Sequence, residues 1–148
     1  MTWHRCEYYR AECGLPAQLV DDDRIVLQLG GVFGAVTMPA GLGRKVVASL
    51  RVRAMPAPAL AHPGGQRWTL LSGPGTVTLD ELAALVLLGV SVVGETAVVV
   101  LPSPETEALG LWHWIEPPTQ VDLPPQAALL TTTRAMAVPT SRTRSAQP

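Results

Sequence analysis

Residues 78–101 have the sequence TLDELAALVLLGVSVVGETAVVVL, which joins a helix signal to a run of strand signals. Thr78 and Glu81 have the spacing of a capping box, in which each side chain bonds the backbone N–H of the other residue. Gly89 supplies a helix stop, because glycine readily adopts the left-handed conformation that ends helices. We therefore expect a helix over 79–88, followed by strands.

The second half of this stretch predicts a buried hairpin. The apolar runs 90–93 and 97–101 flank Gly94-Glu95-Thr96, whose composition is typical of a tight turn. The nearly apolar stretch 82–101 is about as long as a membrane span, but Glu95 would then lie in hydrocarbon. We therefore expect a protein core here and no membrane partner.

Periodicity and turn residues predict further elements on both sides of this stretch. We expect helices over 3–13, 39–52 and 126–137, strands over 17–20, 25–29, 32–38, 58–61, 67–71 and 111–116, and a short helical turn from Ser103. The predicted fold is a single α+β domain over 1–137, with a mixed or antiparallel sheet of short hairpins and about three helices packed on it. Residues 138–148 lack periodicity and are expected to form a disordered, Arg-containing tail.

Composition limits the classes of function. The 148 residues are 47% hydrophobic with a net charge of −1, which fits one globular core and excludes a global positive field. The first ten residues lack an apolar signal segment, so we expect a cytoplasmic protein. Cys6 and Cys13 lie seven positions apart on a predicted helix, too far for a disulfide, and are expected to be buried free thiols. No residue pattern indicates a cofactor or a metal site.

Basic residues gather in one predicted helix and in the tail. A positive patch of this kind can contact phosphates, although most such patches are simply solvated helix faces. The residues expected to contact nucleic acid or another anion are Arg44, Lys45, Arg51, Arg53, Arg142 and Arg144. The glycines before Arg44 resemble a phosphate-binding loop, but the Ser or Thr of that motif is missing.

Two tryptophans alternate with a histidine in a predicted strand. Trp112 and Trp114 should therefore share one face of the sheet, with His113 on the other. The indoles could stack on bases or form a protein interface, but bulky core packing is the favoured interpretation.

Several short motifs stand out along the chain, namely CEYYRA (6–11), AVTMPAGLG (35–43), HP (62–63) with RWTLLSGP (67–74), LPSP (101–104) and WIEPP (114–118). Together they resemble a group of small actinobacterial proteins, some of which are similar to a shortened N-terminal domain of bifunctional primase-polymerases. The resemblance implies a mixed sheet with helices and, in that family, a site of paired acids on a strand and a later histidine. The corresponding strand here, 35–38, holds no acid, so no catalytic residue is carried over.

Three hypotheses for function follow. The first is a non-catalytic binding or regulatory domain, a degenerate primase-polymerase-like module that contacts nucleic acid through the basic helix and tail. The second is a protein-interaction or self-associating module that uses apolar surface or a strand edge near the two tryptophans. The third is a small enzyme whose site combines His62, Asp80 or Glu116 in space.

Overall fold

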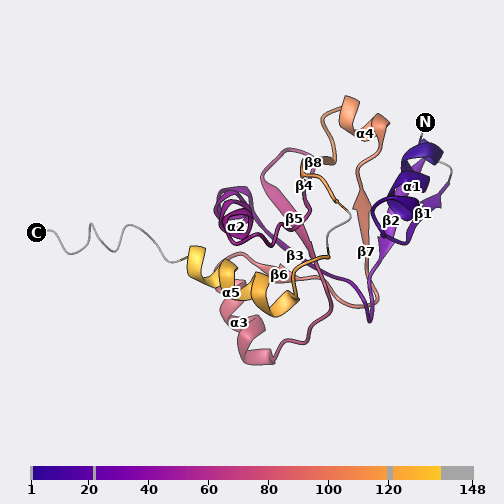
Figure 1. The fold of residues 1–148 in the computed structure, drawn as a ribbon. Helices are drawn as coiled ribbons and strands as arrows, with labels where there is room; N and C mark the ends of the chain where they lie inside the picture. The colour runs from indigo at the N-terminus through magenta and orange to yellow at the C-terminus, as the bar shows by residue number, and fades with distance from the viewer. Residues whose placement is uncertain (1, 22, 120–121, 138–148) are drawn as a thin grey trace, which may run out of the picture.

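Helices separate groups of one to three strands along the chain (Figure 1), and the computed structural model describes residues 2–21, 23–119 and 122–137. The described helices are α1 (Thr2–Ala11), α2 (Ala40–Val52), α3 (Leu79–Leu87), α4 (Pro104–Ala108) and α5 (Gln126–Met136). The described strands are β1 (Ala17–Val20), β2 (Arg24–Gln28), β3 (Gly34–Pro39), β4 (Ala59–Ala61), β5 (Arg67–Ser72), β6 (Ser91–Val92), β7 (Val98–Leu101) and β8 (His113–Glu116). The predicted α+β class is confirmed.

The strands form two antiparallel sheets, one ordered β1-β2-β7 and the other β6-β3-β5-β4-β8. The hairpin predicted over 90–101 is therefore wrong, because β6 pairs with β3 while β7 pairs with β2. Each of these two strands pairs with an edge of an earlier strand that would otherwise be left unpaired. The turn at Gly94-Glu95-Thr96 carries the chain from one sheet to the other.

A second sheet-switching corner lies between β2 and β3. Gly30 and Gly31 have φ angles of 129° and 58°, a region that residues with a side chain rarely adopt. These two glycines turn the chain out of the three-stranded sheet before β3 joins the five-stranded sheet. The corners at 30–33 and 93–97 lie side by side, since Leu29 N donates to Ala97 O at 3.1 Å and Val93 N donates to Ala35 O at 2.9 Å.

The five-stranded sheet separates two hydrophobic clusters. Trp68 and Leu70 of β5 belong to the cluster that α2, α3 and α5 cover, and the neighbouring Leu71 belongs to the other cluster. That second cluster fills the space between this sheet, the three-stranded sheet and α1. Successive strand residues point to opposite faces, so the continuous burial of residues 68–72 shows that β5 is covered on both sides.

The first helix is shorter than predicted. Helix α1 ends at Ala11 and not at Cys13, so Cys13 lies outside the helix and is half-buried, while Cys6 is buried as expected. Both thiols are free.

The predicted tail, 138–148, with Arg142 and Arg144, lies outside the described residues. Among the residues that are described, no helix is long and apolar enough to span a bilayer.

Two glycines of α2 provide a matched test of the packing between this helix and the sheet. A Cβ atom at Gly43 would lie 2.7 Å from Cε3 of the buried Trp68, whereas one at Gly41 would meet nothing within 4 Å. We expect Gly43→Ala to lower the free energy of unfolding by about 1–3 kcal/mol through overpacking. Gly41→Ala should instead raise it by about 0.5 kcal/mol through helix propensity. Urea unfolding of both variants checks this. Equal changes in the free energy of unfolding for the two variants would contradict the close packing of Gly43 against Trp68.

Candidate functional site

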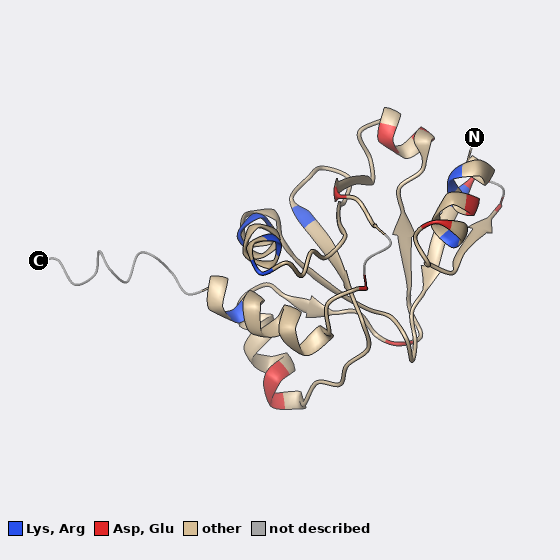
Figure 2. Cartoon of the chain, in the orientation of Figure 1, with Lys and Arg blue, Asp and Glu red and all other residues tan. Residues whose placement is uncertain are grey.

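Four of the basic residues predicted from the sequence lie on the solvent side of α2 and at its end. Arg44, Lys45, Arg51 and Arg53 are all exposed, and we call these four residues the basic face. Figure 2 shows the blue residues of α2 away from the acids of α1 and α4, while Glu81 of α3 is close enough to Arg134 of α5 to interact with its charge. The neighbouring helix α5 packs against α2 and adds Arg134 in its last turn.

Two members of the basic face have partners. The guanidinium of Arg44 lies 5.5 Å from the centre of the Trp68 ring, a cation–π contact that holds the charge at the surface. Arg51 Nε donates to Glu116 Oε1 at 2.9 Å. Within the described part of the chain, Lys45 and Arg53 form no ion pair. The helix therefore presents more positive charge than its single acidic neighbour neutralises.

The two tryptophans pack against the second hydrophobic cluster. Trp114 Nε1 donates to Tyr9 Oη at 2.8 Å, and Tyr9 Oη donates to Pro102 O at 2.6 Å. The rings of Tyr9 and Trp114 meet edge to face, with centroids 5.9 Å apart. Burial raises the pKa of Tyr9, which keeps this phenol in the neutral form that can donate. Trp114 thus ties α1 to β8 and is partly buried by this contact. Trp112 precedes β8, so the prediction that both tryptophans lie in this strand is wrong for Trp112.

The three residues named for a hypothetical enzyme site do not bond to one another. His62 Nε2 lies 2.6 Å from Thr69 Oγ1, Glu116 accepts from Arg51, and Asp80 lies in the first turn of α3. Within the described ranges, no group of three or more His, Cys, Asp or Glu residues could hold a metal ion. His62 and Glu116 thus have partners of their own, and Asp80 is exposed at the start of α3.

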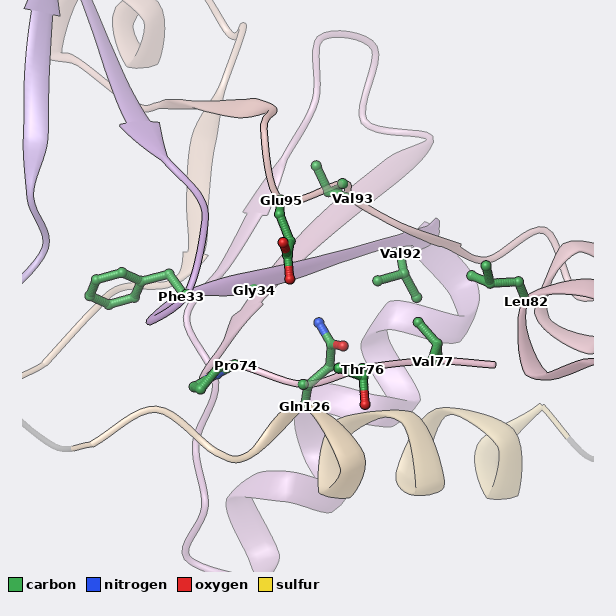
Figure 3. Close-up of a pocket in the computed structure, with 13 residues that line it drawn as sticks. Phe33, Gly34, Pro74, Thr76, Val77, Leu82, Val92, Val93, Glu95 and Gln126 are labelled. Carbon is green, nitrogen blue, oxygen red and sulfur yellow. The ribbon is translucent and has the colours of Figure 1, made fainter. Parts of the chain in front are cut away.

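A pocket that the sequence did not predict lies beside the two sheet-switching corners (Figure 3). Its volume is about 320 Å³, within the range of small-molecule sites. The wall includes Glu95 from one corner, Phe33 from the other, Thr76 from the loop after β5, and Gln126 from the first turn of α5. The only sequence signal was the number of glycines, because Gly31, Gly34, Gly75 and Gly94 all line this pocket.

Comparisons with known proteins found no family model, no curated protein and no solved structure that matches this chain. The resemblance to primase-polymerase relatives therefore stays a prediction from the sequence motifs.

His62 should make the stability of the fold depend on pH. Burial and, secondarily, the charge of Arg67 lower the pKa of His62 below its ordinary value of 6.5. The unfolded chain binds this proton more readily, so the stability is fully present above about pH 6.5 and falls as the pH drops through the lower folded pKa. Urea unfolding between about pH 5 and 7 should show a smaller loss of stability for His62→Gln than for the wild type. Identical pH profiles would show that burial of His62 does not favour its neutral form.

Proposed function

We propose that this chain is a non-catalytic binding domain that contacts the phosphate backbone of a nucleic acid through the basic face of α2. The observation that carries the proposal is the uneven pairing of its cations. On α1, Arg5 Nη2 lies 2.9 Å from Glu107 Oε1, and Arg10 Nη1 lies 3.9 Å from Glu7 Oε1. On α2, in contrast, the described residues leave Lys45 and Arg53 without acidic partners.

Local segregation of charge matters here because the chain as a whole has a net charge of −1. A nearly neutral protein attracts a polyanion only where several cations are close together and their acidic neighbours are few. The exposed cations of α2, with Arg134 on the adjacent α5, meet this condition. The motif resemblance to primase-polymerase relatives over residues 5–118 also favours a nucleic-acid partner.

Contact with phosphates requires no base-specific geometry. Arginine and lysine side chains bind phosphate oxygens and release condensed counterions, which drives binding and makes it sensitive to salt. Arg51 could exchange its bond to Glu116 for a phosphate, since the side chain of Arg51 is 59% exposed. We therefore expect binding that depends on the protein's cations and tolerates changes in the nucleotide sequence.

Removing two cations from the basic face should weaken this binding and reduce its salt dependence. In fluorescence-anisotropy titrations with labelled single-stranded DNA at several salt concentrations, Arg44→Ala with Lys45→Ala should lower the magnitude of the log–log salt slope by about 1.4. The reason is that each phosphate contact on a single strand contributes a slope of about 0.7.

Arg10→Ala is the matched control, because Arg10 is an exposed helix cation on α1. It should leave the slope unchanged. A wild-type affinity that does not vary with salt, or an equal effect of Arg10→Ala, would refute binding through the basic face.

A specific observation also favours a second candidate function, a protein-interaction module. Leu79, Val86 and Leu87 of α3 are 83%, 66% and 87% exposed, although large apolar side chains usually point into the core. These exposed side chains support a protein partner at α3, whereas Trp112 and Trp114 are partly buried.

Self-association through α3 would make the molecular mass rise with concentration. Sedimentation equilibrium of the wild type and of Leu87→Lys tests for self-association through α3. A buried charge at this position of the interface should return a self-associating protein to the monomer. A wild-type monomer at all concentrations would exclude self-association.

A further inference from the structure

Gln126 is a largely buried polar side chain that lines the pocket. The residue is 3% exposed, and its side chain makes no hydrogen bond to any other residue that the structure describes. Among the described residues, the one fully enclosed polar side-chain atom without a partner is Thr132 Oγ1, so the amide of Gln126 reaches the open space of the pocket. The amide can therefore bond water or a ligand there.

Two glycines hold this amide in a fixed position. A Cβ atom at Gly34 would lie 2.5 Å from Gln126 Nε2, and one at Gly75 would lie 2.9 Å from Gln126 Oε1. Any larger residue at either position would therefore push the amide out of place. The side chain is clamped between the start of β3 and the loop after β5, as a preorganised binding group would be.

Glu95 lies on the opposite wall of the pocket. Figure 3 shows its carboxylate and the amide of Gln126 pointing toward one another, from the sheet-switching turn and from α5. Val77, Leu82 and Val92 line the same pocket and provide its apolar surface. The site thus combines a negative acceptor, an amide that both donates and accepts, and an apolar wall.

We propose that this pocket binds an amino-substituted nitrogen heterocycle of nucleobase size, such as adenine or cytosine. An exocyclic amino group next to a ring nitrogen presents a donor beside an acceptor, which is the pattern that a glutamine amide pairs with in two hydrogen bonds. The second amino hydrogen can donate to the carboxylate of Glu95, and the flat ring can lie against the valines and Leu82. Gly31 and Gly94 have open space beside them and leave room for a ring close to the backbone.

The base could belong to a free nucleoside or to an unpaired position of a nucleic-acid strand. Both present the same edge to Gln126 and Glu95. The inference does not depend on the basic face of α2, because none of its four residues lines the pocket.

Saturation-transfer NMR and isothermal titration with adenosine, cytidine, inosine and uridine test the proposal. Inosine is adenosine with the exocyclic amino group replaced by a carbonyl oxygen, so it keeps the size and ring but presents an acceptor where adenosine presents the amino donors for Gln126 and Glu95. Adenosine and cytidine should bind about tenfold or more tightly than inosine and uridine. No binding by adenosine or cytidine, or equal binding of adenosine and inosine, would overturn the proposal.

Gln126→Met separates a binding role from a structural one. Methionine is similar in size but has no amide, so the variant should lose adenosine binding while its melting temperature stays the same or rises. If the amide were needed for the fold, the melting temperature would fall instead, and that result would count against the proposal. Gln18→Met, at an exposed position of β1, is the control and should leave both quantities unchanged.

A short oligonucleotide with unpaired adenines distinguishes the two sources of the base. If a free nucleoside is the ligand, adenosine should compete fully with the oligonucleotide at the pocket. If the strand supplies the base, the oligonucleotide should bind more tightly than adenosine, and Gln126→Met should remove that difference. Tighter oligonucleotide binding that Gln126→Met leaves intact would contradict recognition of a base in this pocket.

Discussion

The antiparallel ladder between β3 and β5 is the constraint on which the rest of the structure depends. Six residue pairs join the two strands, from Gly34 with Ser72 to Pro39 with Arg67. The two ends of β3 position the two surfaces of functional interest. Its first residue, Gly34, lines the pocket, and its last residue, Pro39, leads directly into α2 and the basic face. A shift in the register of β3 would displace both.

The pocket follows from the way two chain segments leave one sheet for the other. Strands that change sheets need bends, and glycine permits the unusual backbone angles and close approach that a bend requires. Gly31, whose φ angle is positive, serves one corner, Gly94 lies in the other, and both line the pocket. The bends required by the fold thus create the room in which Gln126 and Glu95 face one another.

Local signals in the sequence were sufficient to predict most elements, and long-range pairing was not. The capping box of Thr78 and Glu81 marks the start of α3, because it depends only on residues within one turn. The turn at 94–96 has the same composition whether it closes a hairpin or joins two sheets, so the partners of β6 and β7 were not predicted. The cations of α2 were visible as a cluster, but the burial of Gln126 depends on Gly34 and Gly75, which are distant in sequence.

The most direct test of the central claim, that the fold directs nucleic acid to α2, is a residue-resolved NMR titration of the labelled protein with single-stranded DNA at low salt. We expect amide shifts to change along Ala40–Arg53 and in the last turn of α5, where Arg134 lies. Changes confined to α1 and the β1–β2 hairpin, or no changes at any amide, would contradict it.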